Sequence, residues 1–215
     1  MVRGVGRTEG TLLVTAVLVA LVTTGVQAKA PGTWFLEVVW ILLGLPLVVA
    51  LRKRFPLTRL LCWLLVLHAV VLCYGGQYTY AETPLGEWVQ DWLGTRRNDY
   101  DRLGHFVQGF VPAVAVREVL LRRTPLRPGG WVAFLTVSVC LAISACFEFV
   151  EWFSALIAGS GADAFLATQG DVWDTQWDML LCLCGAVVSV LVWRRLHDRQ
   201  LAGPVRDAGA AAAAT

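Results

Sequence analysis

The chain has 215 residues, of which 57% are hydrophobic and only 16% are charged. Soluble domains carry about 25% charged residues, so this composition excludes a soluble enzyme, a nucleic-acid-binding protein and a disordered chain. It is typical of a protein whose main partner is the lipid bilayer. The formal net charge is +2, which becomes informative only when the charges are divided between the two sides of a membrane.

Six apolar runs along the chain are each long enough to cross a bilayer, since a membrane-spanning helix needs about 20 apolar residues. We therefore expect an all-α fold, a polytopic membrane helix bundle of about six transmembrane helices that forms one domain over residues 1–200. Residues 201–215 are of low complexity and are predicted to be a disordered cytoplasmic tail. The six runs cover residues 11–28, 34–51, 60–76, 103–121, 131–157 and 176–193.

The first run allows a second interpretation. Arg3 and Arg7 precede it, and it ends in Val26-Gln27-Ala28, which resembles a signal-peptide cleavage site. Cleavage of residues 1–28 would leave five spans and would not change the sidedness of the others. We expect the run to be retained, because it is long enough to span the membrane.

The basic residues predict the orientation, because short loops rich in Lys and Arg stay in the cytoplasm. With six spans, 14 basic and 4 acidic residues fall on the side that holds both termini, and 4 basic and 12 acidic residues fall on the other side. This division predicts that the N-terminus and the C-terminus are both cytoplasmic.

The connection between the third and fourth spans, residues 77–102, is the longest loop. Trp88 and Trp92 lie one helical turn apart within it, which predicts a short amphipathic helix on the membrane surface. All 6 cysteines lie in apolar runs, where we expect them to act as small hydrophobic residues and not as a disulfide framework.

Acidic residues gather near the predicted outer ends of spans four, five and six, where apolar residues would insert into the membrane at a lower free-energy cost. They recur every three or four residues, which places each set on one face of its helix. Glu37, at the start of the second span, lies at a similar depth. The three sets are Asp101 with His105, then Glu148 with Glu151, and then Asp171, Asp174 and Asp178.

A charged side chain at the middle of a span costs about 2.5–3.5 kcal/mol, so this cluster predicts a compensating cation. Protonated His105, Arg102 or a bound metal ion could supply it. Carboxylates with one histidine suit Mg²⁺, Mn²⁺ or iron. We predict His105, Glu148 and Asp178 as catalytic residues, and a divalent metal held by Asp101, His105, Glu148, Glu151, Asp171, Asp174 and Asp178.

Simpler roles remain open for single residues. Asp101 and Asp171 can cap helices, and the Glu151 side chain can reach the lipid headgroups. We expect His68 to pack in the core and His197 to be solvated in the tail. Arg117-Glu118 is expected to mark the inner boundary of the fourth span.

Three ordered motifs give the chain a family resemblance, which extends over roughly residues 35–200. It resembles the YjdF-like inner-membrane proteins. The resemblance implies a multi-pass protein of the bacterial plasma (inner) membrane and implies no particular reaction. The motifs are Asp101-Arg102-Leu103-Gly104-His105-Phe106-x-x-Gly109-Phe110, Phe147-Glu148-x-x-Glu151-Trp152 and Gly170-Asp171-x-x-Asp174-x-x-x-Asp178-Met179.

A looser likeness is to the VanZ-like membrane proteins, which show an Asp-x-x-x-His, a Glu-x-x-Gln and a final Asp followed by Asn and Gly. Here Glu151 stands in place of the glutamine and Cys182 in place of the asparagine. VanZ-like proteins are linked to glycopeptide resistance, so the likeness implies a lipid or glycan substrate from the cell envelope.

Three functions follow as hypotheses. The first is a metal-dependent hydrolase or transferase that acts on a lipid-linked or other envelope precursor at the outer face. The second is a non-catalytic envelope protein with a structural ion site. The third is a cation- or proton-coupled transporter, against which residues 131–140 and 185–192 contain no acid, so that no polar route is expected to cross the bilayer. The sequence predicts neither the substrate nor the oligomeric state.

Overall fold

The computed structural model describes residues 2, 4–158 and 163–202. Regular structure in this part of the chain is helical throughout, which confirms the predicted all-α class. The predicted disordered tail lies outside the described residues from position 203 onward. The helices are α1 (Arg7–Val26), α2 (Pro31–Leu51), α3 (Arg59–Gln77), α4 (Pro84–Leu93), α5 (Tyr100–Arg123), α6 (Gly130–Ala158), α7 (Asp163–Leu166) and α8 (Asp174–Ala202).

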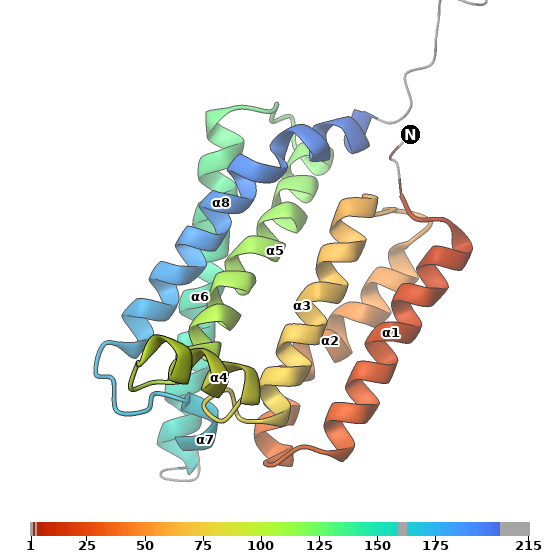
Figure 1. The fold of residues 1–215 in the computed structure, drawn as a ribbon. Coiled ribbons are helices and arrows are strands. Elements are labelled where there is room, and N and C mark those ends of the chain that lie inside the picture. The colour runs from red at the N-terminus through yellow and green to blue at the C-terminus, as the bar shows by residue number, and fades with distance from the viewer. Residues whose placement is uncertain (1, 3, 159–162, 203–215) are drawn as a thin grey trace, which may run out of the picture.

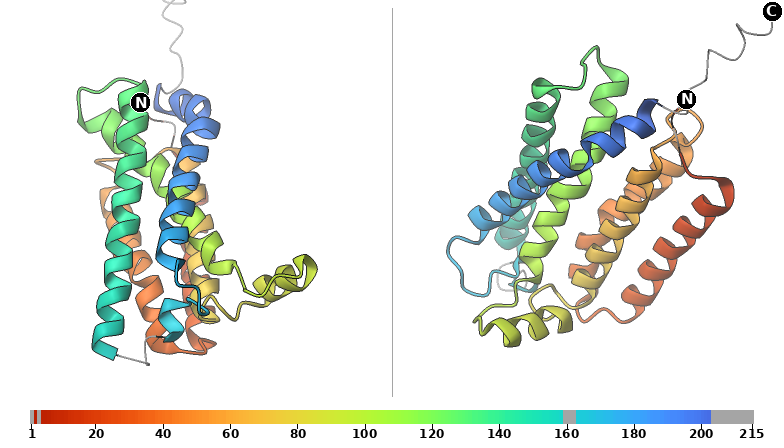
Figure 2. Two further views of the ribbon diagram at one scale, coloured as in Figure 1. Left: turned by 90° about the vertical axis from the view of Figure 1, so that its left-hand side faces the viewer. Right: turned by 45° about the horizontal axis from the view of Figure 1, so that its top comes forward.

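The long helices form a bundle in which α1, α2 and α3 lie on one side and α5, α6 and α8 on the other (Figure 1). Successive long helices run in opposite directions, so both ends of the described chain lie at the same end of the bundle (Figures 1 and 2). We call this the inner end, and the opposite end, which carries α4 and α7, the outer end. This arrangement agrees with the predicted placement of both termini on one side.

Five helices are long and apolar enough to cross a membrane, namely α1, α2, α3, α6 and α8. Helix α5 has 24 residues and is therefore about 36 Å long, which also suffices to span a bilayer. Six of its residues are charged, as many as in α8. The polytopic helical class is confirmed, and α5 as the sixth span stays a prediction.

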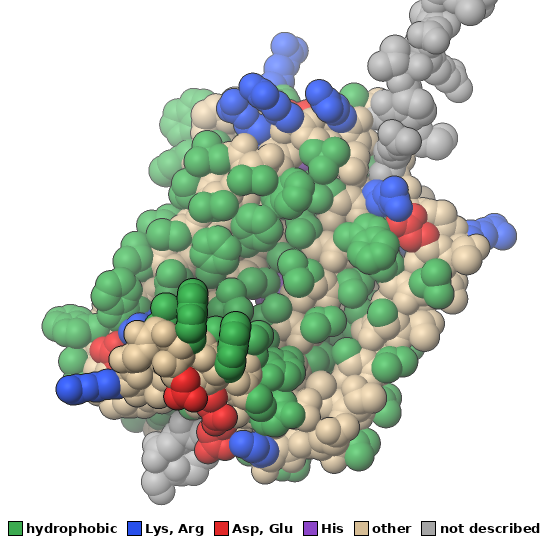
Figure 3. Space-filling view, viewed as in Figure 1, with side chains coloured by type: hydrophobic (Ala, Val, Ile, Leu, Met, Phe, Trp, Pro, Cys, Tyr) green, Lys and Arg blue, Asp and Glu red, His purple; other side chains and the backbone are tan. Residues whose placement is uncertain are grey.

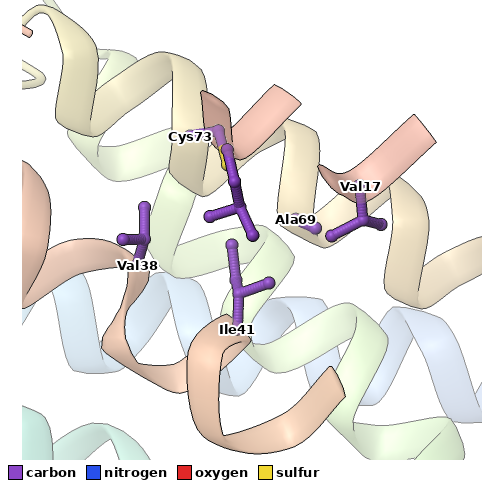
Figure 4. Close-up of a cluster of buried hydrophobic side chains, with 6 residues drawn as sticks. Val17, Val38, Ile41, Ala69 and Cys73 are labelled. Atoms are coloured by element: carbon purple, nitrogen blue, oxygen red, sulfur yellow. The ribbon is translucent and has the colours of Figure 1, made fainter. Parts of the chain in front are cut away.

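Helices α1, α2 and α3 share one apolar core. Val17 of α1, Val38 and Ile41 of α2, and Ala69 and Cys73 of α3 all point into it (Figure 4). Side chains from three helices interdigitate here, and this close packing stabilises the bundle through van der Waals contact, because lipid tails are as apolar as the side chains themselves. Helix α1 is thus part of the core, and retention of residues 1–28 stays a prediction.

Helices α5 and α8 approach closely because glycines face the partner backbone. A Cβ atom on Gly109 would overlap the carbonyl oxygen of Cys182, and one on Gly185 would overlap that of Phe106. Small residues at such crossings let two membrane helices come into backbone contact. The close approach sets the register that brings the outer end of α5 against the outer end of α8.

The surface of the bundle fits a lipid environment. Hydrophobic side chains cover its flank, basic side chains gather at the inner end, and acidic side chains gather near α4 (Figure 3). Exposed aliphatic and aromatic residues are normal on such a flank because lipid, not water, surrounds it. The visible face therefore shows the same separation of charges that the sequence predicts.

Candidate functional site

Asp101, His105 and Asp178 meet between the outer ends of α5 and α8. One ligand atom from each lies within 4.8 Å of the other two. All three are buried, with exposed fractions of 8%, 5% and 2% respectively. Asp101 and His105 are four residues apart on α5 and so share a face, and the α5–α8 contact brings Asp178 to that face.

The orientation of the His105 ring is fixed by Gln108. The Nδ1 atom of His105 lies 3.0 Å from Oε1 of Gln108, and because an amide oxygen only accepts, Nδ1 carries the hydrogen. The Nε2 atom faces Oδ1 of Asp101 at 3.7 Å and Oδ2 of Asp178 at 4.0 Å. Two carboxylates and a ring nitrogen thus converge, and the positive charge between them would come from a proton on Nε2 or from a metal ion.

Glu148 of α6 lies on the other side of the His105 ring. Its Oε1 atom is 4.0 Å from His105 Nδ1. Within the described residues, Oε1 of Glu148 and Oδ1 of Asp178 are buried and lack a hydrogen-bond partner. Buried polar atoms are rarely left without a partner, so these two oxygens are available to bind a water molecule or an ion.

The remaining predicted ligands are placed differently. Asp174 forms an ion pair with Arg97, whose guanidinium also lies 3.5 Å from Asp101. Asp171 pairs with Arg102 at 2.7 Å. Glu151 lies about one turn farther out than Glu148 on α6 and is partly buried. The structure therefore does not bring Asp171, Asp174 and Glu151 into the group of three, and their role as ligands stays a prediction.

The structure can be compared with the helix-capping roles suggested for Asp101 and Asp171. The residue that precedes α5 is Asp99, and Asp101 lies within the first turn of that helix, so a capping role does not account for Asp101. Asp171 accepts a hydrogen bond from the backbone N–H of Trp173 at 2.9 Å, just ahead of α8. Asp171 thus supports the start of α8 as well as pairing with Arg102.

Tyr80 is a residue that the sequence reasoning missed. Its ring is buried, and Cβ atoms on Gly75 of α3 or Gly104 of α5 would collide with it. Thr79 and Tyr80 have φ values of 57° and 54°, in the left-handed region that ordinary residues avoid. Burial raises the pKa of the Tyr80 phenol well above its ordinary value, so the side chain is a neutral hydroxyl. Nothing in the local sequence signals this turn.

A second buried network lies at the inner end. Glu118 of α5 accepts hydrogen bonds from Thr58 Oγ1 at 2.7 Å and from Arg122 at 2.6 Å. His197 of α8 lies 3.2 Å from Glu118 through Nε2, and its Nδ1 is 3.1 Å from Arg117. Because Arg117 only donates, Nδ1 accepts and Nε2 carries the hydrogen.

This network corrects two expectations. His197 is 1% exposed, so its predicted solvation was wrong. Helix α8 runs on to Ala202, past the predicted end at residue 193, because its polar last turns pack against α5. Glu118 is fully buried, and α5 continues past it to Arg123, so Arg117-Glu118 does not end the helix and its place at the inner boundary of the span stays a prediction. The spacing of Glu118 and Arg122 at i and i+4 was the available signal for an ion pair.

The fold and the charge pattern define a multi-pass helical membrane protein. Residues 10–199 match the family described as "Predicted membrane protein (DUF2238)". The chain belongs to this family.

A relative supports the same assignment. The chain is 51% identical over 181 residues to "Inner membrane protein YjdF" of Escherichia coli (strain K12), which covers 84% of this chain and 87% of the relative. The family and this relative confirm the resemblance seen in the motifs and identify a multi-pass inner-membrane protein. No solved structure matches the chain.

Proposed function

We propose that the chain binds one divalent metal ion between Asp101, His105 and Asp178, and that the metal centre hydrolyses or transfers a group of a lipid or envelope precursor at the outer face. The observation that carries the proposal is the set of three potential ligand atoms, one from each residue, that lie within 4.8 Å of one another. Ligand atoms that are each about 2.1 Å from one octahedral ion lie about 3–4.2 Å apart. The distances of 3.7 Å and 4.0 Å from His105 Nε2 fit this range.

The donor set favours particular metals. Two carboxylates and one imidazole suit Mg²⁺, Mn²⁺ or iron better than a thiolate-binding metal. Gln108 holds the Nδ1 side of His105, as partners of metal-binding histidines commonly do. Glu148, on the same side of the ring, has a positioning role in this proposal.

A bound metal would lower the pKa of a water ligand and so supply a nucleophile near neutral pH. Asp178 can accept the proton from that water through Oδ1, its oxygen atom that lacks a hydrogen-bond partner among the described residues. His105 would hold the metal and Asp101 would balance its charge. The looser likeness to VanZ-like proteins favours an envelope lipid or glycan as the substrate.

Metal binding is tested first, with the full chain purified in detergent and stripped by a chelator. We expect wild type to bind one Mn²⁺ per chain in calorimetry and elemental analysis. Asp178→Asn and Asp101→Asn should weaken binding by about 100-fold. Asp91→Asn is the matched control, because Asp91 is an exposed carboxylate on α4 and belongs to none of the predicted ligand sets. A wild type without stoichiometric metal, or an unchanged affinity in Asp178→Asn, would overturn the proposal.

Catalysis is tested separately, as release of phosphate from phosphatidic acid and from a polyprenyl diphosphate in mixed micelles with Mn²⁺. We expect turnover by wild type and its loss in Asp178→Asn. A metal-loaded wild type that turns over neither probe would overturn the catalytic part for phosphate-bearing lipids.

A structural ion site is the second candidate, because burial of all three ligands favours an ion that ties α5 to α8. Metal removal would then lower the unfolding temperature, and the metal-loaded protein would turn over neither lipid probe.

A further inference from the structure

The connection between α2 and α3 is basic and is held against the inner end of α5. Residues 52–54 are Arg, Lys and Arg, and all three are exposed. Later in the same connection, Thr58 donates to Glu118 of α5 from its backbone N–H at 3.2 Å and from Oγ1 at 2.7 Å. The carbonyl oxygen of Pro56 accepts from Arg122 at 2.7 Å. These buried contacts fix the connection in place relative to α5.

Phe55 joins the same connection to the last residues of α5. The guanidinium carbon of Arg122 lies 3.6 Å from the centroid of the Phe55 ring, and that of Arg123 lies 5.0 Å from it. A guanidinium group over an aromatic face is attracted to the ring. Arg123 is exposed, so its position is defined by the ring while its N–H groups remain accessible from outside the bundle.

The acidic residues at the inner end are already paired. No acid occurs between Glu37 and Glu82, so the connection itself holds no counter-charge. In the described part of the inner end, each acid has an arginine partner: Glu9 pairs with Arg59, Glu118 with Arg122 and Asp198 with Arg117. Four other basic residues, which we call the inner basic cluster, form no ion pair with the described residues. They are Arg52, Lys53, Arg54 and Arg123.

Orientation in the membrane accounts for the charge of this cluster but not for its arrangement. Basic residues keep a short loop in the cytoplasm whatever their positions in that loop. Here two segments far apart in the sequence are tied together by Glu118 and Phe55, and basic side chains from both become neighbours. Like charges that are held close together repel one another. The arrangement therefore favours an anion as the partner of the cluster.

The depth of the cluster indicates which anion is at hand. Arg123 is the last residue of α5, and Val119, one turn earlier on the same face, is 48% exposed. Trp131, at the start of α6, is 73% exposed, and tryptophan is typical of the membrane interface. Basic side chains gather at this end above a hydrophobic flank (Figure 3). The cluster thus lies at the level of the lipid headgroups, with a surface for acyl chains next to it.

We propose that the inner basic cluster binds one anionic phospholipid of the cytoplasmic leaflet. The lipid phosphate accepts hydrogen bonds from Arg54 and Arg123, and an acyl chain lies against Val119. Arginine suits this role because its planar group can donate two parallel hydrogen bonds to a phosphate. A zwitterionic lipid carries its own ammonium group and brings no net charge, so the cluster prefers an anionic lipid. This site lies at the end of the bundle opposite the candidate metal site, and the inference does not rest on the proposed function.

The test uses the full chain, freed of lipid in detergent and titrated with phosphatidylglycerol or with phosphatidylethanolamine of the same acyl chains. Native mass spectrometry gives the Kd of the first bound lipid. We expect phosphatidylglycerol to bind about tenfold more tightly than phosphatidylethanolamine. One basic residue contributes about fivefold to the affinity for an anionic lipid. Arg54→Gln and Arg123→Gln should therefore each weaken phosphatidylglycerol binding about fivefold, and the double variant about 25-fold.

Arg195→Gln is the matched control. Arg195 is an exposed arginine of α8 that forms no ion pair with the described residues, so this variant removes the same charge from the same end of the bundle. It lies two residues from the buried His197 and thus on another side of the helix. We expect Arg195→Gln to bind phosphatidylglycerol as wild type does.

Three results would overturn the proposal. One is an equal Kd for the two lipids. Another is an Arg195→Gln variant that binds as weakly as Arg123→Gln, since the attraction would then be a general property of the inner end. The third is displacement of phosphatidylglycerol by an excess of inorganic phosphate, which would indicate a site for a free anion.

Circular dichroism and gel filtration establish that each variant is folded, and Lys53→Gln replaces either arginine variant that is not. Mn²⁺ binding is measured on the same variants. Their affinity for Mn²⁺ should equal that of wild type, because Asp178 lies at the outer end. Failure of the lipid site is therefore distinguishable from failure of the metal site.

Discussion

Gly109 on α5 has the backbone of α8 directly in front of it. A Cβ atom there would overlap the carbonyl oxygen of Cys182, and that atom belongs to a rigid helix that cannot move aside alone. The same contact sets the distance between His105 and Asp178. The absence of a side chain at this one glycine thus determines both the packing of two helices and the geometry of the candidate site.

We expect Gly109→Ala to destabilise the bundle by about 1–3 kcal/mol, the usual cost of overpacking, and also to weaken Mn²⁺ binding. The measurement is unfolding in detergent by SDS titration, followed by calorimetry with Mn²⁺. Gly44→Ala on α2 is the control, because a Cβ atom at Gly44 meets nothing within 4 Å, and it should change stability by at most about 1 kcal/mol. Equal stability of the two variants would contradict the close contact.

At the scale of single residues, the sequence predicted part of the site. Asp101 and His105 are i and i+4 on one helix, so their common face followed from spacing alone. The spacing did not predict which of the other acids would instead pair with arginines. Arg97 and Arg102 hold Asp174 and Asp171, and which carboxylate a guanidinium binds depends on how the loops fold over the helix ends.

Among the elements, α4 is the one that stands apart from the bundle (Figure 2). Trp88 and Trp92 are stacked on it with ring centroids 6.5 Å apart, and they are 65% and 75% exposed. Hydrophobic side chains gather on the side of α4 turned toward the middle of the bundle and acidic ones on the opposite side (Figure 3). This polarity is that of a helix lying in the membrane interface with its apolar side toward the lipid.

We expect the double variant Trp88→Ser/Trp92→Ser to release α4 from the lipid interface. Hydrogen exchange in lipid nanodiscs should show the amides of residues 85–93 exchanging about tenfold faster than in wild type, because the buried aromatic surface that orders the helix is lost. Glu87→Gln is the control and should leave exchange unchanged. If the double variant is as protected as wild type, α4 is held by protein contacts instead.

The long helices were predictable as elements because each is a run of apolar residues of membrane length, and their ends agree with the predicted ones within a few residues except at α8. That helix continues to Ala202 because His197 is buried against Glu118. Charged residues near a span end look like a boundary in the sequence, and only a partner on another helix shows that the helix goes on.

For the whole molecule, the testable consequence is the topology. We predict six crossings with both termini in the cytoplasm, since the inner end carries most of the basic residues. In a cysteine-free background, a cysteine at Gln90 of α4 should react with a membrane-impermeant maleimide in intact cells. A cysteine at Lys53, between α2 and α3, should react only after permeabilisation. Labelling of both positions in intact cells would contradict this topology.

The sequence by itself determined the membrane class, the positions of the apolar helices, the charge asymmetry that predicts orientation, and the gathering of acids near one end. These are local or summed properties, because hydrophobic run length, helical period and charge do not depend on which helix packs against which. The tertiary structure decided the rest. The crossing of α5 and α8 at Gly109 and Gly185 selected Asp178 to face His105, and the same packing buried His197 against Glu118. Contacts between distant residues depend on the distance and register of neighbouring helices. Distance and register are set by pairs of residues on two different helices, so the sequence of one helix alone does not predict them.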